Sequence, residues 1–120
     1  MDRERGAALV EFALLLPVLV LLIFGIVEFG RAYNASVTLT HATREGVREL
    51  AISRDAGSAV AVTKSAAPTL DPLQITVVTD DCTPGEPTRV EATYPFHYSI
   101  PLYGDGTVTL RATAVMRCGG

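Results

Sequence analysis

Glu11 is the residue with the clearest chemical consequence, because it is a carboxylate inside an otherwise apolar run near the N-terminus. An ionised carboxylate costs about 2.5–3.5 kcal/mol at the centre of a lipid bilayer and less near an interface, so something should compensate it. One interpretation is that Glu11 lies close enough to the lipid headgroups to reach water. The other is functional, and it depends on the residues in front of Glu11.

Other residues that could carry chemistry form no recognisable site. His41 and His97 are the only histidines, and no H-x-x-x-H or C-x-x-C spacing lies near either, so we expect no metal. Asp80 and Asp81 precede Cys82 and could hold calcium, but an ordinary turn accounts for the pair. Because serine-nucleophile motifs, glycine-rich phosphate loops and paired catalytic carboxylates are absent from the sequence, we expect no enzyme activity and no cofactor.

Composition restricts the chain to one small domain with an apolar segment. The 120 residues include 10 Lys and Arg, 13 Asp and Glu and no Trp, which gives a formal net charge of −3. The basic residues are scattered, so the chain lacks the positive patch of a nucleic-acid-binding protein, and nucleic acid is not an expected partner. Residues 12–27 carry no charge, which excludes a simple soluble globule.

The apolar run predicts a helix that crosses a membrane. Residues 7–30 read AALVEFALLLPVLVLLIFGIVEFG, with charges only at Glu11 and Glu28. At about 1.5 Å per residue this helix would reach roughly 36 Å, enough for a hydrocarbon core of about 30 Å. A buried helix of a soluble protein is the competing interpretation, but the rest of the chain is too short to cover every face. Pro17 removes one backbone donor and predicts a kink near residues 13–17.

The charges at the two ends of the run predict its orientation. Arg3 and Arg5 precede the run and Arg31 alone follows it, which favours a cytoplasmic N-terminus. We therefore expect a single-pass protein of the cytoplasmic (inner) membrane, with everything from Arg31 onward outside. A removed secretory signal peptide is the alternative, but residues 28–35 contain no small-x-small cleavage site and the run is longer than an ordinary signal sequence.

After the apolar run the sequence predicts a continuation of the helix and then a small α+β lobe. Residues 31–53 contain no proline and carry one amphipathic stripe. The stripe consists of Leu39, Ala42, Gly46, Val47 and Leu50. One helix is therefore expected over residues 7–52, with a break at 54–57. Residues 58–67 predict a short second helix with Ser58 as a possible N-cap.

Beyond Pro72 the hydrophobic period changes to two, which is typical of strands with one buried face. The alternating runs are residues 74–79, 89–100 and 107–116, separated by loops rich in Pro, Gly and Asp. They predict a three-stranded antiparallel sheet. Pro95 cannot donate a ladder hydrogen bond, so the middle run is expected to be an edge strand or to bend there. Three aromatic residues of that run are expected in the core: Tyr94, Phe96 and Tyr98.

Cys82 and Cys118 follow the first and third of these runs. An up-down-up arrangement places those strand ends at the same end of the sheet, so we expect a disulfide, which conditions outside the cytoplasm permit. Closing that loop would stabilise the lobe by about 3–4 kcal/mol. Two free thiols, or pairing between chains, are the alternatives.

The N-terminal part of the chain resembles a known family. Residues 6–12 hold a glycine, four small or apolar residues, Glu11 and Phe12, and a short basic leader precedes them. This pattern resembles the processing site of type IV prepilins in the tight-adherence (Tad/Flp) branch. Residues 3–52 are similar to the TadE-like pseudopilin family through the VEFALLLP string and the Arg-Gly in front of it. The resemblance weakens after residue 52.

The resemblance implies that a prepilin peptidase cuts between Gly6 and Ala7, and that Glu11, followed by Phe12, serves subunit assembly. The carboxylate would pair with the free N-terminal amine of a neighbouring subunit, which lowers the penalty that each charge suffers alone in lipid. The implied function is that of a minor pilin or pseudopilin, a structural component of a tight-adherence pilus. The implied partners are the peptidase, other pilins and pseudopilins, the inner-membrane assembly platform and membrane lipid.

The expected organisation is a leader at residues 1–6, a transmembrane helix at 7–30, an extracytoplasmic continuation of the helix at 31–55 and a lobe at 56–120. Two rival functions stay open. One is an uncleaved, membrane-tethered assembly subunit. The other is a membrane-anchored binding module or adhesin, whose lobe would recognise a ligand or a surface.

Overall fold

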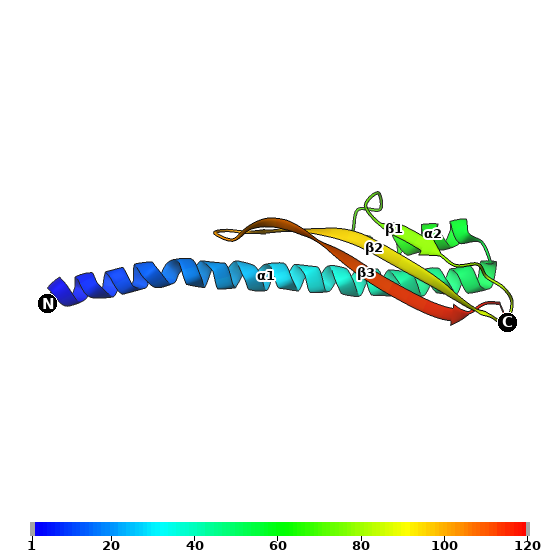
Figure 1. Ribbon diagram of the computed structural model, residues 1–120, viewed down its shortest axis with the longest axis horizontal. Coiled ribbons are helices and arrows are strands. Elements are labelled where there is room, and N and C mark those ends of the chain that lie inside the picture. Colours follow the sequence, from blue (N-terminus) through cyan, green and yellow to red (C-terminus); the bar gives the residue numbers. More distant parts are fainter. Residues whose placement is uncertain (1, 120) are drawn as a thin grey trace.

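The computed structural model describes residues 2–119 as one long helix with a lobe along its C-terminal half (Figure 1). Met1 and Gly120, the outermost residues of the expected leader and lobe, lie outside the described residues. The elements are helices α1 (Asp2–Ser53) and α2 (Ala56–Ser65) and strands β1 (Thr76–Thr79), β2 (Pro87–Ile100) and β3 (Gly104–Arg117). The strands form one antiparallel sheet in the order β1-β2-β3, so the predicted α+β fold is confirmed.

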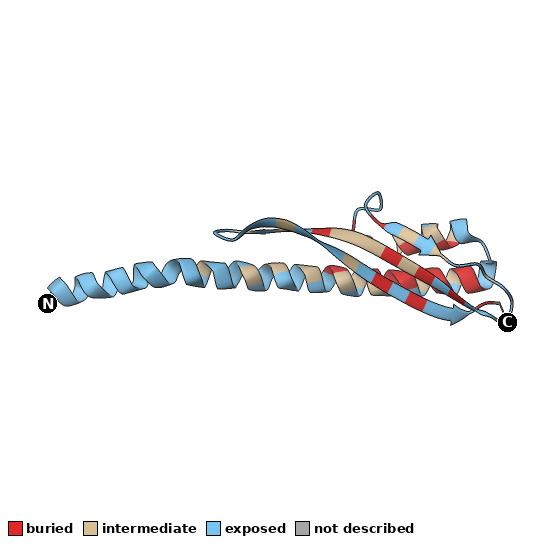
Figure 2. Ribbon diagram, viewed as in Figure 1, coloured by how far each residue is buried: buried red, intermediate tan, exposed pale blue. Residues whose placement is uncertain are grey.

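Helix α1 has two unlike halves (Figure 2). Its eight buried residues all lie between Ala35 and Ala51, whereas residues 2–19 are exposed throughout. The predicted amphipathic stripe is the buried part, because residues three and four apart share one face of a helix and that face meets the lobe. One half of α1 is thus a core element, and the other half is a bare shaft.

The ends of α1 differ slightly from the predicted ones. The described helix covers Asp2–Ser53, so residues 2–6 of the expected leader are helical as well, and Asp2 and Glu4 in the first turn favour a helix N-terminus. It continues through Pro17 as one helix, and the predicted kink stays a prediction. At the other end Arg54 adopts a left-handed φ of 57° and its N–H donates to the carbonyl of Leu50 at 2.9 Å, which terminates the helix.

The predicted start of the second helix is wrong. Helix α2 begins at Ala56, and its N-cap is Asp55, whose carboxylate accepts a hydrogen bond from Gly57 N at 2.9 Å. The Ser58 hydroxyl does not cap the helix but donates to the second Asp55 oxygen at 3.1 Å. Asp55 prevails because its two carboxylate oxygens can accept both bonds at once.

Strands β2 and β3 form a hairpin that is longer than predicted. They pair over their whole lengths, from Pro87 opposite Arg117 to Ile100 opposite Gly104. Strand β1 pairs only with residues 90–93 of β2, so β2 is the central strand there. Pro95 lies beyond that short pairing, where no strand among residues 2–119 pairs with the β1 side of β2, and this is how a proline fits a nominally central strand.

The core lies between the sheet, α1 and α2. It forms two clusters, one around Leu39, Ile75 and Phe96 and one around Leu50 and Val90. Alanines on β2 and β3 let the sheet lie close against the helix: Ala92, Ala112 and Ala114. Of the three aromatic residues predicted in the core, Phe96 is buried and the two tyrosines are half-buried.

A disulfide joins Cys82 to Cys118, with their Cα atoms 5.5 Å apart. The N–H of Gly119 donates to the carbonyl of Ala51 at 2.9 Å, next to the end of α1. The Cys82 sulfur also lies 3.3 Å from the carbonyl oxygen of Leu50. The open end of the β2–β3 hairpin is therefore fixed to the C-terminal end of α1.

Candidate assembly surface

Gly6 and Ala7, the predicted cleavage position, lie on the exposed first part of α1. A Cβ added to Gly6 would meet no atom within 4 Å, so neither the lobe nor another element covers this bond. Glycine costs a helix about 1 kcal/mol relative to alanine. The leader end of α1 is therefore held only by its own helical hydrogen bonds, and local opening there disturbs no tertiary contact.

Glu11 is exposed on the same part of α1, and none of the ion pairs among residues 2–119 involves it. Its helical neighbours are apolar, and Phe12 beside it is 59% exposed. Over the described residues, the carboxylate thus lies on an apolar surface without a paired cation. Whatever neutralises it in a membrane has to come from outside the described part of this chain.

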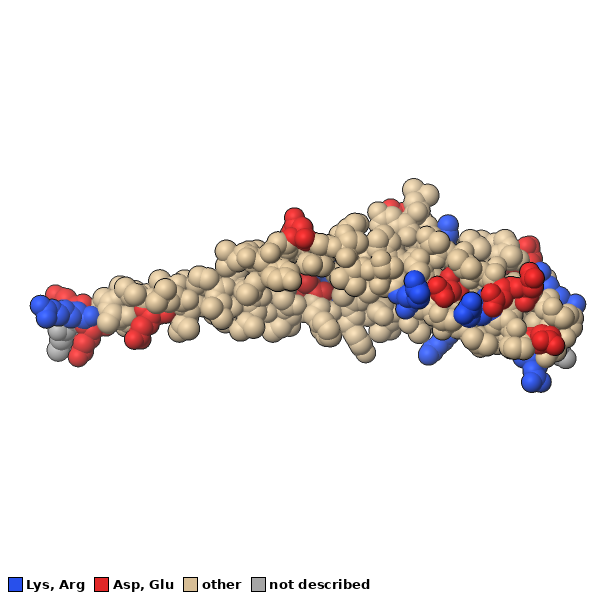
Figure 3. Space-filling view, viewed as in Figure 1, with Lys and Arg blue, Asp and Glu red and all other residues tan. Residues whose placement is uncertain are grey.

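The shaft between Glu11 and Glu28 is an apolar surface that is largely exposed in the described chain (Figure 3). A stretch of 18 residues in this helix has a mean hydropathy of 2.8, and none of its residues is buried. Leu14, Ile26 and Phe29 are each more than two-thirds exposed. A patch of this extent marks a surface that meets lipid or another protein, and the helix is long and apolar enough to cross a membrane.

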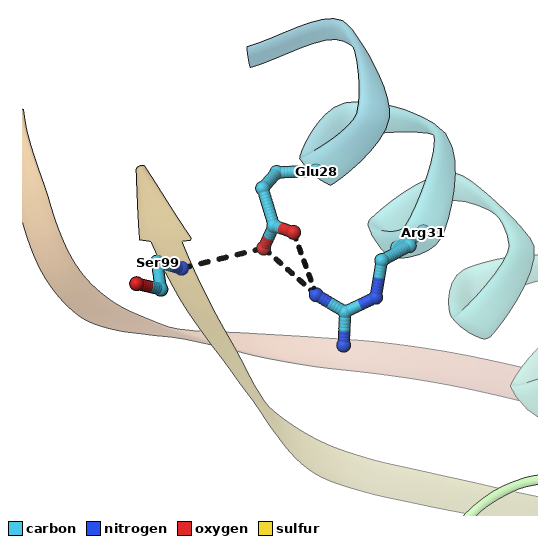
Figure 4. Close-up of polar contacts among 3 residues, drawn as sticks. All are labelled: Glu28, Arg31 and Ser99. Carbon is cyan, nitrogen blue, oxygen red and sulfur yellow. Dashed lines mark hydrogen bonds and ion pairs between the residues drawn. The ribbon is translucent and has the colours of Figure 1, made fainter. Parts of the chain in front are cut away.

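Glu28, at the outer end of the shaft, has the partners that Glu11 lacks (Figure 4). One Arg31 nitrogen donates to both Glu28 oxygens, at 2.7 and 2.8 Å, and the Ser99 N–H donates to Oε2 at 3.3 Å. The Glu28 side chain is only 12% exposed, whereas that of Arg31 is 58% exposed. The guanidinium also lies 5.2 Å from the centre of the Phe96 ring, within range of a cation–π contact. This link fastens β2 to α1.

Sequence reasoning missed this link. It treated Glu28 only as the end of the apolar run, although the spacing of Glu28 and Arg31 is one at which opposite charges on a helix meet. The partner on β2 could not be found from local pattern, because Ser99 lies 71 residues further along the chain.

The remaining candidate residues are dispersed. His97 shares a hydrogen bond of 2.9 Å with the Thr107 hydroxyl on the exposed face of the hairpin, and His41 lies exposed on α1. Asp80 lies 3.5 Å from Arg89 in an ion pair that is half-exposed. Over residues 2–119, no group of three or more His, Cys, Asp or Glu is placed to hold a metal ion.

Comparison with known proteins adds one finding. The family model described as TadE-like protein matches residues 6–48, which comprise the candidate cleavage position, the apolar shaft and most of the buried stripe. No curated protein and no solved structure matches the chain. The resemblance predicted from the sequence is thereby confirmed over residues 6–48, which match the model of a family associated with the Tad pilus.

Proposed function

We propose that this chain is a minor pilin or pseudopilin of a tight-adherence (Flp-type) type IV pilus, processed by a prepilin peptidase between Gly6 and Ala7. The observation that carries the proposal is Glu11, a carboxylate on an apolar shaft with no ion-pair partner in the described chain. Such a group is costly in lipid and is retained where it has a function. The family match over residues 6–48 supports the same assignment.

Cleavage would supply the missing cation. It frees the amine of Ala7 at the start of the mature helix, and an ammonium in lipid carries the same kind of penalty as the carboxylate. A neighbouring parallel helix displaced by four residues, or about 6 Å along the axis, brings its own Ala7 amine level with Glu11. The two charges then neutralise each other, so each subunit is bound more favourably beside another than alone.

The rest of the shaft supplies the packing surface. Phe12 and its apolar neighbours are exposed in the single chain and would be covered by adjacent helices in a fibre, or by lipid before assembly. Before assembly the chain would reside in the cytoplasmic membrane, with its N-terminus inside and its lobe outside. There it would meet the peptidase, sibling pilins and the assembly platform.

The experiment is to determine the N-terminal residue and intact mass of the membrane-extracted protein, with and without a prepilin peptidase in the expressing cell. We expect a chain that starts at Ala7 only when the peptidase is present. The variant Gly6→Leu should stay uncut. The matched control Gly30→Leu should be cut normally, because Gly30 is equally open on the same helix.

Two outcomes would overturn the proposal. A chain that keeps its leader beside an active peptidase would be a membrane-tethered assembly subunit. A chain that still functions after its helix is replaced by an unrelated membrane span would be a tethered binding module.

A further inference from the structure

The β2–β3 hairpin is too long to cover only the lobe half of α1. Its open end is fixed beside Ala51 by the Gly119 hydrogen bond and the disulfide. A strand of 14 residues extends about 46 Å, which equals about 30 residues of helix at 1.5 Å per residue. Measured back from Ala51, the closed end of the hairpin therefore passes Glu28. Figure 1 shows it lying beside the shaft, on the N-terminal side of the lobe.

Specific contacts fix this position. The Ser99 N–H donates to Glu28, so the residues that follow Ser99 lie on the N-terminal side of Glu28. Ile100 and Tyr103 line one side of a groove of about 400 Å³, and Gly25 and Phe29 of α1 line the other. We name residues 100–104 the hairpin tip. It is level with the uncharged part of the shaft.

From the hairpin tip toward the lobe, the first charged residue of the β2–β3 hairpin lies at the same height along α1 as Glu28. Asp105 pairs in register with Ser99, and Ser99 contacts Glu28, which pairs with Arg31. On the lobe side of this level, Figure 3 shows several Lys, Arg, Asp and Glu side chains on the surface of the lobe. On the other side, neither residues 12–27 of the helix nor the hairpin tip carries any charge. The level of Glu28 is therefore a common polar boundary for helix and hairpin.

The hairpin tip has the composition of a membrane-interface segment. It reads Ile-Pro-Leu-Tyr-Gly, and Leu102 and Tyr103 are 76% and 70% exposed. Leu102 has a φ of 72°, a conformation that leucine rarely adopts and that glycine or asparagine would adopt more easily. Turn geometry therefore does not account for a large apolar side chain at this position. Tyrosine is enriched where protein crosses from hydrocarbon to headgroups.

We propose that the hairpin tip enters the outer leaflet of the bilayer that α1 spans, so that each chain contacts the membrane at two places. Acyl chains fill the groove between α1 and the tip, and the Glu28–Arg31 pair lies at the headgroups. This inference rests on the proposed membrane position of α1. A single helix can rotate and tilt freely in lipid, whereas a second contact fixes the rotation and the depth of the shaft, and with them the direction in which Glu11 points.

Tryptophan fluorescence tests this directly, because the chain contains no Trp. Three single-Trp variants of the full chain are reconstituted in phosphatidylcholine–phosphatidylglycerol vesicles with and without brominated acyl chains. Leu102→Trp reports on the tip and Phe24→Trp on the shaft. Leu73→Trp is the matched aqueous control, because Leu73 is 91% exposed in the segment between α2 and β1. We expect the brominated lipid to quench the tryptophan fluorescence of Leu102→Trp and Phe24→Trp. The fluorescence of Leu73→Trp should be unchanged.

The outcomes distinguish insertion of the hairpin tip from the membrane position of α1 on which it rests. Quenching of Phe24→Trp alone would overturn insertion of the tip and leave the membrane helix intact. Absence of quenching at Phe24→Trp would overturn the membrane position on which both depend. A blue-shifted Leu102→Trp that brominated lipid does not quench would mean that the tip packs against another protein, which also overturns the proposal. Tyr103→Trp, which keeps an aromatic ring, repeats the measurement if Leu102→Trp reduces the yield of folded protein.

Discussion

Glu11 and Glu28 bracket the same apolar run of the same helix, yet their surroundings are opposite. Glu28 accepts hydrogen bonds from Arg31 and from the Ser99 backbone, and its side chain is 12% exposed. Glu11 is exposed and takes no part in the ion pairs of the described residues. The difference shows that folding of the lobe onto α1 supplies Glu28 with a hydrogen-bond donor from β2. Within residues 2–119, folding gives Glu11 no such partner.

Neutralising Glu11 should produce the largest effect on function. Glu11→Gln removes the charge at nearly constant shape, so membrane insertion and the fold of the lobe should be unchanged. Losing the partner of a buried charge costs about 3–5 kcal/mol, so incorporation into fibres should fall by roughly 100-fold or more. The measurement is the ratio of this chain in sheared pili to that in membranes. Equal or greater loss in Glu28→Gln would contradict the distinction between the two carboxylates.

Removing the disulfide should produce the largest effect on the lobe. The double variant Cys82→Ser/Cys118→Ser opens a connection between residues separated by 36 positions, and the cost should be about 3–4 kcal/mol. Urea unfolding of the detergent-solubilised chain, followed by near-ultraviolet circular dichroism of the tyrosines, measures it. Reduction of the unaltered chain should lower the urea midpoint by a similar amount. An unchanged midpoint would show that the bond contributes little to fixing the hairpin on α1.

Alanine substitutions at two glycines, one in each half of α1, should have opposite effects on stability. A Cβ at Gly46 would collide with the buried Thr63 hydroxyl, which donates to the carbonyl of Ala59 at 2.7 Å. Gly46→Ala should therefore destabilise the lobe by about 1–3 kcal/mol. Gly30→Ala meets no atom within 4 Å and should stabilise the helix by up to about 1 kcal/mol. The same urea titration compares them, and equal shifts would mean that the packing of α1 on α2 is looser than described.

Glu28→Gln should have the smallest effect. Arg31 is 58% exposed, so solvent screens the pair and its loss should cost less than about 1 kcal/mol. The expected consequence is local, with hydrogen exchange at the Ser99 amide faster by several-fold. The amide of Val90, in the buried part of β2, is the internal control. Unchanged exchange at Ser99 would mean that Glu28 does not hold the hairpin.

The sequence predicted the parts of this molecule that depend on local periodicity. Leu39 and Leu50 lie on one helical stripe, and Val90 and Ala92 alternate with polar neighbours, so burying one face of each element fixed the helix and the strands. The start of α2 was mispredicted because Asp55 and Ser58 are both good N-caps, and only the folded geometry decides between them.

Local periodicity could not predict how far the β2–β3 hairpin extends along α1. This extent depends on where the open end of the hairpin is fixed on α1 and on a contact between Glu28 and Ser99, two residues that are 71 positions apart in the sequence. Strand length and helix rise, taken together with the attachment at Ala51, would have indicated it. Around Glu11, the composition of the run identified the carboxylate, whereas the absence of an ion-pair partner among residues 2–119 emerged only from the folded chain.

The central claim is that an amine from another subunit neutralises Glu11, and zero-length carbodiimide coupling in assembled pili tests it most directly. The reagent joins a carboxylate to an amine in contact with it, and Lys64 is the only lysine of this chain, so the products are few. Mixing isotopically light and heavy chains distinguishes coupling between chains from coupling within one. The account predicts an amide between the Glu11 carboxylate and the N-terminal amine of a second pilin subunit. Coupling of Glu11 only to its own chain, or only to a small amine added from solution, would contradict it.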